Sequence, residues 1–276
     1  MNGLTCRAAV DRDLPRMKAL WQLCFGDEAA EIDCLLSCLY APGVGLVLEA
    51  EGQVQSMLLS LPLTLVGQGG EALPARYVYA FCTHPAAQSR GYGRTLLAWA
   101  EEQAAAQGCA AVAMVPGEAS LFAFYEGLGY ARAFPRQTRK GVPAAAPDAV
   151  IAPVPPEEYG TRREALLAGS AHCRYPLPFL EAQQALSLAS GGGLYTVTVG
   201  NAPYLAAAEG GAGDALVLRE LLGPAEAAPA AASALCAALG RGRWLFHAPG
   251  QGEPYGVVKW LSGTRVDECY LGLSLE

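Results

Sequence analysis

A glycine-bearing turn between an apolar segment and an amphipathic helix restricts the fold of this chain more than any other feature. The turn, residues 88–94, reads Gln-Ser-Arg-Gly-Tyr-Gly-Arg; the strand-like residues 77–82 precede it, and a helical pattern begins at Thr95. A turn that opens a helix leaves backbone N–H groups unpaired, and the helix dipole adds partial positive charge there. Arg90 and Arg94 add charge-assisted contacts suited to a pyrophosphate. The stretch therefore predicts a phosphate site on a strand–turn–helix unit.

The spacing of the glycines separates the known phosphate-binding motifs. A dinucleotide-binding fingerprint needs a further glycine or alanine where this chain has Leu96, and a Walker loop needs a Gly-Lys-Ser/Thr ending that the sequence lacks. The remaining pattern, Gln-x-x-Gly-x-Gly at Gln88, Gly91 and Gly93, resembles motif A of the GNAT superfamily of acetyl-CoA-dependent N-acetyltransferases. The resemblance implies that acetyl-CoA, the acetyl donor, binds at this turn.

A second motif lies downstream and carries the chemistry. Residues 122–130 resemble the closing signature of the same family, in which a tyrosine stands four residues before a Gly-Tyr or Gly-Phe pair. Tyr125 matches the catalytic tyrosine, whose phenol, with an ordinary pKa near ~10, can protonate a departing thiolate of pKa about 8.5. The resemblance also implies that a bulge splays the strand at Phe81, Cys82 and Thr83, whose backbone then binds the pantetheine and thioester.

The predicted cofactor-binding residues come from the splayed strand, the turn and the start of the last helix. They are Phe81, Cys82, Thr83, Gln88, Ser89, Arg90, Gly91, Tyr92, Gly93, Arg94, Thr95 and Ser120. An apolar stripe through residues 121–128 leaves open that Tyr125 is a packing residue with a paired hydroxyl. Cys82 is interpreted as a packing residue rather than a nucleophile, because no partner base is evident. The general base stays unassigned.

The order of predicted elements indicates two domains of the same type. In the first half, helices are expected at 13–26, 29–39, 91–107 and 118–127, and strands at 45–50, 54–65, 76–83 and 110–115. In the second half, helices are expected at 157–167, 179–189 and 226–239, and strands at 194–199, 204–208, 215–221, 243–247, 256–261 and 268–274. The expected fold class is α/β (α+β): tandem GNAT-like domains, each with a mixed, mostly antiparallel sheet flanked by helices.

Residues 141–156 are rich in proline and alanine, which is typical of a linker. This predicts a catalytic, acetyl-CoA-binding domain at 1–143 and a degenerate second domain at 150–276. The second domain has Gly223-Pro224-Ala225-Glu226 where the phosphate turn would lie. Pro224 lacks an N–H donor and Glu226 adds negative charge, so this half is expected to bind no acetyl-CoA.

The first half, including the run Trp-x-x-Cys-Phe-Gly-Asp at 21–27, resembles the enhanced-intracellular-survival (Eis) group of acetyltransferases. Members of that group carry two GNAT-like domains followed by a sterol-carrier-like domain. This sequence reaches Glu276, about where the third domain would begin. In that group the third domain delivers a terminal carboxylate that can act as the base, so the resemblance assigns no such role to Glu276.

Charge and cysteine usage restrict the partners. The net charge of −7 argues against a nucleic-acid partner and suits a cationic amine. Without an apolar run of about 18 residues or a signal-peptide core, the chain is expected to be cytoplasmic and free of membrane contacts. The nine cysteines form no Cys-x-x-Cys pair, and Cys34 and Cys38 have no histidine nearby, so no metal is expected.

These features together predict an N-acetyltransferase that moves the acetyl group of acetyl-CoA to an amine by direct attack in a ternary complex. The acceptor is expected to be a small molecule or a peptide, and aminoglycoside-like amines, polyamines, lysine side chains and amino acids all stay open. The alternative is a non-catalytic acyl-CoA-binding module that serves as a sensor or assembly platform. Homo-oligomer formation is also left open.

Overall fold

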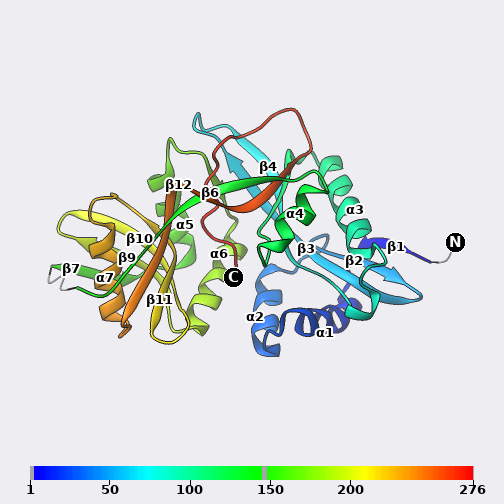
Figure 1. The fold of residues 1–276 in the computed structure, drawn as a ribbon, viewed down its shortest axis with the longest axis horizontal. Helices are drawn as coiled ribbons and strands as arrows, with labels where there is room; N and C mark the ends of the chain where they lie inside the picture. The colour runs from blue at the N-terminus through cyan, green and yellow to red at the C-terminus, as the bar shows by residue number, and fades with distance from the viewer. Residues whose placement is uncertain (1–2, 145–147, 276) are drawn as a thin grey trace. The chain divides into compact units, whose positions relative to one another are not determined.

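The computed structural model describes residues 3–144 and 148–275, and the chain divides into two units built from interleaved segments (Figure 1). Unit 1 contains Met1–Thr64, Ala72–Arg132 and Gly256–Arg265. Unit 2 contains Leu65–Glu71, Ala133–Tyr255 and Val266–Glu276. Each unit therefore takes in a segment from beyond the sequence boundary expected near residues 143–150, and the proposal of two separately folding domains there stays a prediction.

Unit 1 is a mixed sheet whose helices follow the predicted pattern, with ends that differ by a few residues. Its strands lie in the order β1 (Thr5–Ala8), β2 (Gly45–Ala50), β3 (Gln53–Val66), β4 (Ala72–Thr83), β5 (Ala111–Met114) and then the last part of β12 (Arg243–Trp260). Its helices are α1 (Leu14–Phe25), α2 (Ala29–Leu39), α3 (Tyr92–Ala106) and α4 (Ser120–Glu126). The β4–β5 pair is parallel, whereas β12 joins β5 antiparallel through Val257–Trp260.

Helices cover both faces of the unit 1 sheet. Val78 of β4 lies in a core cluster with Leu96 of α3, whereas the next residue, Tyr79, packs edge-on against Trp21 of α1 with ring centroids 5.4 Å apart. Successive side chains of a strand point to opposite faces, so α3 and α1 lie on opposite sides of the sheet.

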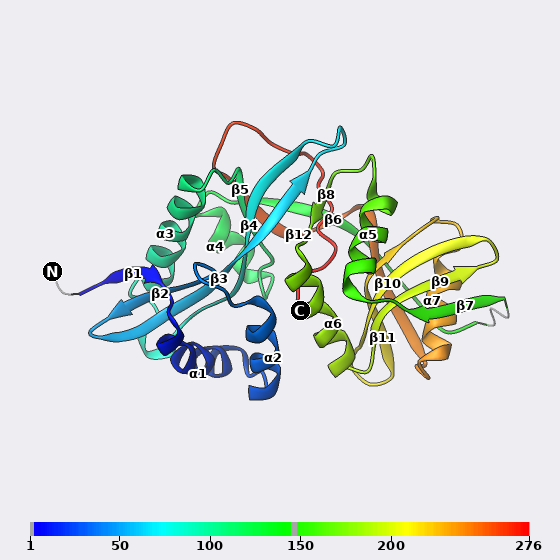
Figure 2. The same ribbon diagram turned by 180° about the vertical axis from the view of Figure 1, so that it is seen from behind.

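The strands of unit 2 are mixed and mostly antiparallel (Figure 2), and they have a hydrophobic core of their own. Its strands run in the order β12, β11 (Ala215–Leu222), β10 (Ala202–Gly210), β9 (Gly193–Val199) and β7 (Ala149–Pro153), with β6 (Ala131–Gly141) paired to β12. Its helices are α5 (Pro156–Leu167), α6 (Leu177–Ala189) and α7 (Ala228–Ala238), and a short strand β8 spans His172–Arg174. The predicted fold class is confirmed in both units.

Three expectations for the second half were wrong. The stretch expected to be linker contains β7, an edge strand that pairs antiparallel with β9; Ile151 packs on the core and Pro153 needs no second neighbour. The two strands expected at 243–247 and 256–261 are the single strand β12. Residues 268–274 form no strand, because only the isolated bridge His172↔Tyr270 pairs them within the described chain.

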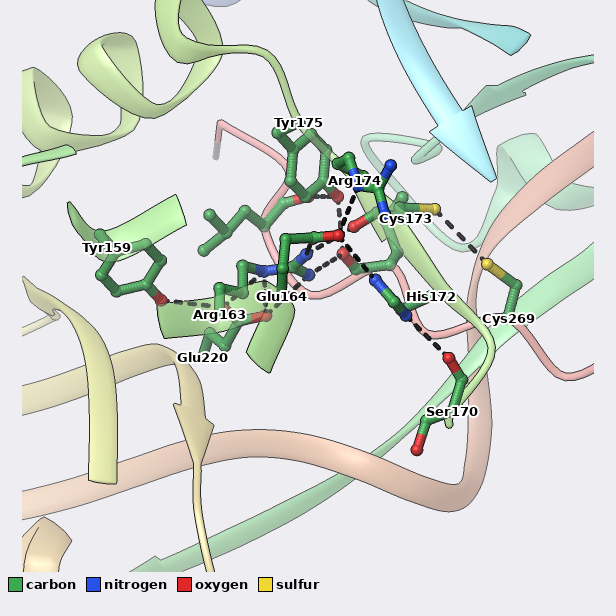
Figure 3. Close-up of polar contacts among 12 residues, drawn as sticks. Tyr159, Arg163, Glu164, Ser170, His172, Cys173, Arg174, Tyr175, Glu220 and Cys269 are labelled. Carbon is green, nitrogen blue, oxygen red and sulfur yellow. Dashed lines mark hydrogen bonds and ion pairs between the residues drawn. The ribbon is translucent and has the colours of Figure 1, made fainter. Parts of the chain in front are cut away.

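A buried ion pair holds the last described segment in unit 2 (Figure 3). Arg163 of α5 is only 1% exposed, and its Nε donates to Oε2 of the fully buried Glu220 at 2.9 Å. Nη2 of Arg163 donates both to Glu220 Oε1 at 3.0 Å and to the Leu271 carbonyl at 3.2 Å, and the Tyr175 hydroxyl donates to the same carbonyl at 2.6 Å. Because both charges are paired and hydrogen-bonded, removal of either partner would leave an uncompensated buried charge. Glu276 lies outside the described residues.

Candidate functional site

The site begins at a distortion near the end of β4. This strand pairs with β5 over Ala75–Tyr77, whereas β4 itself continues to Thr83. Ala80 has a φ of 49°, a left-handed conformation that costs a non-glycine residue about 1–2 kcal/mol. One residue in this conformation reverses the alternation of the strand, as in a β-bulge. Accordingly, Phe81 packs against the α3 side, whereas Tyr79 packs against α1.

The predicted phosphate turn has a backbone suited to an anion. Gly91 precedes α3 with a φ of 82°, and Ser89 is also left-handed, with a φ of 62°. The first hydrogen bond of the helix runs from the Thr95 N–H to the Gly91 carbonyl at 2.9 Å. The N–H groups of the residues between them therefore have no acceptor in the helix, and they lie at its positive end. Left-handed turns of this kind form anion-binding concavities.

Gly93 is required by packing rather than by its own conformation. A Cβ placed on Gly93 would lie 3.1 Å from the Thr83 Oγ1 and 3.2 Å from the Phe81 Cζ, tighter than most real contacts. The Thr83 hydroxyl is held in turn by the buried Ser56 Oγ at 2.9 Å, and the same Ser56 hydroxyl donates to the Cys82 carbonyl. Close approach of α3 to the end of β4 thus fixes the turn beside the distorted strand.

A pocket of about 540 Å³ lies at this junction. Eight predicted cofactor residues line it, joined by Ala87 and Phe124: they are Thr83, Gln88, Ser89, Arg90, Gly91, Tyr92, Gly93 and Arg94. Within the described chain, Arg90 and Arg94 have no ion-pair partner, and both are exposed. The pocket therefore combines unpaired N–H donors with two available guanidinium groups.

The other four predicted cofactor residues do not line this pocket. Phe81 packs on the core edge and Cys82 is buried. The Thr95 hydroxyl donates to the Gly91 carbonyl at 3.1 Å, and the exposed Ser120 hydroxyl donates to Glu118. These contacts use the side-chain hydroxyls of Thr95 and Ser120 within the protein itself.

Tyr125 on α4 combines a buried ring with an unpaired hydroxyl. The ring is 7% exposed and meets the Tyr130 ring edge-on at 5.8 Å between centroids. Burial raises the pKa of Tyr125 to about 12. The neighbouring Tyr130 donates to Glu101 at 2.7 Å, whereas the Tyr125 hydroxyl has no hydrogen-bond partner among residues 3–144 and 148–275. A tyrosine that serves only packing usually has its hydroxyl paired, as Tyr130 does.

The sequence analysis did not assign two residues of this region, Phe124 and Cys24, to the site. Phe124 is 40% exposed and lines the pocket, although its place in the apolar stripe through residues 121–128 indicates a core position. Cys24, in the last turn of α1, donates from Sγ to the Thr83 carbonyl at 3.6 Å. No sequence signal joins Cys24 to the end of β4, since the contact depends on the distortion at Ala80.

The corresponding turn of unit 2 is filled by protein. The Tyr204 hydroxyl donates to the Pro224 carbonyl at 2.7 Å, and Gly223 lies against the Tyr204 ring. Helix α7 starts only at Ala228, after this turn. Across the described residues, no group of three or more His, Cys, Asp or Glu side chains could hold a metal ion, and no helix is long and apolar enough to cross a membrane.

Comparisons with known proteins concern the fold. Residues 5–133 match a family model described as an acetyltransferase (GNAT) domain. Eis1 from Mycobacterium abscessus is 14% identical with a TM-score of 0.65, over 94% of this chain and 73% of that one. A GCN5-related N-acetyltransferase from Anabaena variabilis is 14% identical with a TM-score of 0.69, over 94% and 71%. A tandem GNAT protein from the clavulanic acid biosynthesis pathway is 14% identical with a TM-score of 0.54, over 95% and 100%.

A search of curated proteins finds no match to the sequence. Because these solved structures are only 14% identical to this chain, their likeness establishes the fold alone.

Proposed function

We propose that this protein transfers the acetyl group of acetyl-CoA to an amine by direct attack in a ternary complex, because residues 5–133 match a family model described as an acetyltransferase (GNAT) domain. The observation that carries the proposal is the pocket at residues 88–94, where unpaired helix N–H groups and two unpaired arginines meet the end of β4. That combination suits the pyrophosphate of a coenzyme A thioester. The fold supports acyl transfer in general, and the acetyl donor and amine acceptor are the proposed part.

The distorted end of β4 suits the acyl arm of the donor. Beyond Tyr77 the strand has backbone groups that do not pair with β5, and the pocket wall continues from the turn to Thr83. An extended pantetheine arm binds well to a free strand edge, since it carries amide groups that can complete the backbone hydrogen bonds. We propose that the thioester lies along residues 81–83, with its carbonyl oxygen facing a backbone N–H of this segment.

Tyr125 is the proposed partner of the leaving sulfur. In the reaction, the amine nitrogen forms a bond to the carbonyl carbon, the C–S bond breaks, and the amine gives up a proton. Because the pKa of Tyr125 is raised to about 12, its hydroxyl stays protonated at neutral pH, but full transfer of that proton to a thiolate is unfavourable. A hydrogen bond from the hydroxyl to the developing thiolate provides the stabilisation instead.

Release of free coenzyme A tests this function directly. The full chain is incubated with acetyl-CoA and a panel of small amines, polyamines and lysine peptides, and the thiol is followed with a chromogenic disulfide. Tyr125→Phe is expected to lower turnover by about 100-fold while acetyl-CoA affinity changes less than about twofold. Tyr130→Phe is the matched control, since its hydroxyl is bound to Glu101 and its loss should affect thermal stability more than turnover.

A non-catalytic acyl-CoA-binding module would give a different result. It would bind acetyl-CoA but release no thiol with any amine, and Tyr125→Phe would change nothing but stability. The unpaired hydroxyl of Tyr125 favours catalysis over this alternative.

A further inference from the structure

A second pocket, of about 540 Å³, is formed in unit 2 by β6 and the middle of β12. Its lining comes from two short segments, residues 136–139 of β6 and residues 251–255 of β12, and these strands are paired. The proposed function uses none of these residues. The charged side chains of the lining are Arg136, Arg139 and Glu253, so the pocket carries one net positive charge.

Arg136 has no hydrogen-bond acceptor for its guanidinium group among the residues that the structure describes. Its Nη1 is buried, so water does not reach that nitrogen either. Nε and Nη2 also lack an acceptor but are not buried, and they form the accessible edge of the group. A partly buried arginine normally pairs its N–H donors with carboxylate or carbonyl oxygens, as Arg163 does. The positive charge of Arg136 is therefore unpaired in the described chain.

The surroundings of Arg136 hold this guanidinium in one place. Its Cζ lies over the Tyr255 ring, 3.1 Å from the ring centroid. The Tyr255 hydroxyl is 2.5 Å from the Ser274 Oγ, which anchors the ring in turn. Close by, a Cβ placed on Gly252 would lie 2.1 Å from the Arg136 carbonyl oxygen, so the two strands approach tightly at this point. Because the guanidinium is already ordered, a ligand that binds it loses little additional entropy.

The charge of Arg136 acts on a neighbouring imidazole. Burial, and then the charges of Arg136 and Arg219, lowers the pKa of His247 to about 3. The imidazole borders the pocket, since its Nδ1 lies 2.9 Å from the Oγ1 of Thr138 in the lining. An anion bound to Arg136 would offset one of these charges and raise the pKa of His247. The imidazole therefore reports on occupancy of the pocket.

We propose that this pocket binds a small organic carboxylate, whose two oxygens accept from Nε and Nη2 of Arg136. The planar guanidinium edge matches a carboxylate in this bidentate arrangement, and charge-assisted bonds of this kind are about twice as strong as neutral ones. A phosphate group, which carries nearly two negative charges at neutral pH, suits the pocket less well because Glu253 repels the added charge. This binding is separate from acetyl transfer, which is assigned to unit 1.

A nuclear magnetic resonance titration of the full chain tests the proposal, with sodium acetate, benzoate and phosphate as probes at neutral pH and constant ionic strength. The amide signals of residues 136–139 and 251–255 report binding at this pocket, so binding of phosphate at Arg90 and Arg94 is not mistaken for it. Saturable shifts with acetate and benzoate are expected at these signals, with phosphate weaker by about threefold or more. The imidazole signals of His247 should move with the same affinity.

Three variants separate the guanidinium edge from the overall charge. Arg136→Gln should weaken benzoate binding about tenfold or more, because it removes both the charge and the paired donors. Arg139→Gln is the matched control: it removes the same charge from the lining but leaves the Arg136 edge intact, and it should weaken binding only about twofold. Glu253→Gln removes an exposed repelling charge and should strengthen binding about twofold. This gain cannot result from misfolding.

The outcomes that would overturn the proposal are read at the same signals. No saturable shift at residues 136–139 and 251–255 with either carboxylate excludes the site. Equal losses in Arg136→Gln and Arg139→Gln would show attraction by net charge alone. Tighter binding of phosphate than of benzoate would refute the choice of a carboxylate. Should Arg136→Gln fold poorly, Arg136→Lys keeps the charge but not the planar edge, and it should still weaken binding about fivefold.

Discussion

His247 is the single residue whose protonation most directly opposes folding of unit 2. It is 8% exposed on β12, with its Nδ1 2.9 Å from the Thr138 Oγ1. Burial, and then the charges of Arg136 and Arg219, lowers the pKa of His247 to about 3. Below about pH 6.5 the unfolded chain binds a proton that the folded chain does not, so the free energy of unfolding falls as the pH drops towards 3.

Replacement of this imidazole should flatten that dependence. His247→Asn keeps a partner for Thr138 but cannot titrate. Between pH 7.5 and 4.5 the original protein is expected to lose about 2 kcal/mol more than the variant in the free energy of unfolding, measured by urea denaturation. Parallel losses in both proteins would show that His247 is protonated in the folded state.

At the scale of single residues, the phosphate turn at 88–94 could be predicted from the sequence, whereas the contact of Cys24 with the end of β4 could not. Gly91 meets a local backbone requirement, the left-handed turn before α3, and the structure places both Gly91 and Gly93 at the pocket. The contact of Cys24 with the Thr83 carbonyl follows the distortion at Ala80, a residue whose side chain gives no sign of a left-handed φ. An uninterrupted alternation of side chains through residues 77–82 would place Phe81 and Cys82 on the opposite faces of the sheet from those they occupy.

Among the elements, the last part of β12 has the clearest energetic role, because it supplies a charge to unit 1. The Lys259 Nζ donates to the Glu101 Oε2 on α3 at 2.5 Å, and Tyr130 donates to the other carboxylate oxygen. Glu101 is 8% exposed. Lys259→Met would leave this carboxylate without a counter-charge, and we expect a loss of about 2 kcal/mol in the free energy of unfolding of unit 1.

The surface pair of Lys18 and Asp33 is the matched control for that prediction. Both side chains are substantially exposed, so Lys18→Met should change stability by less than about 0.5 kcal/mol. Chemical denaturation followed by the far-ultraviolet signal gives both values. The role assigned to β12 would be wrong if the two variants were equally stable.

Most helix and strand positions in the first half could be predicted from their hydrophobic period, but the strands β1 and β6 were not expected. The second half was harder for physical reasons. Gly252 interrupts the sequence pattern of β12, yet the strand continues through it. A glycine stands there because β6 passes so close that a Cβ at 252 would clash with the Arg136 carbonyl. In β7, proline suggested a linker, but an edge strand tolerates it.

For the whole molecule, the two unequal turns predict one acetyl-CoA per chain. Isothermal titration calorimetry of the full chain should give a single site. Gly91→Val should abolish binding, because its backbone is left-handed and a branched side chain would fill the approach to the helix N-terminus. Should that variant be poorly folded, Arg90→Ala with Arg94→Ala should still lower affinity about tenfold.

Glu226→Ala in the turn of unit 2 is the control, and it should leave the stoichiometry at one. Two equivalent sites in the original protein, or a site that survives Gly91→Val, would contradict the assignment of a single cofactor turn.

The exchanged segments have a consequence for how the protein is made. The strand Val257–Trp260 completes the sheet of unit 1 beside β5, yet it is synthesised after nearly all of unit 2. During translation one edge of β5 stays unpaired until this segment leaves the ribosome. Unpaired strand edges can pair with another chain and so promote aggregation. Nascent chains halted before residue 257 should therefore depend on chaperones more than longer chains do, because a segment that is made late in synthesis closes the unit that was begun first.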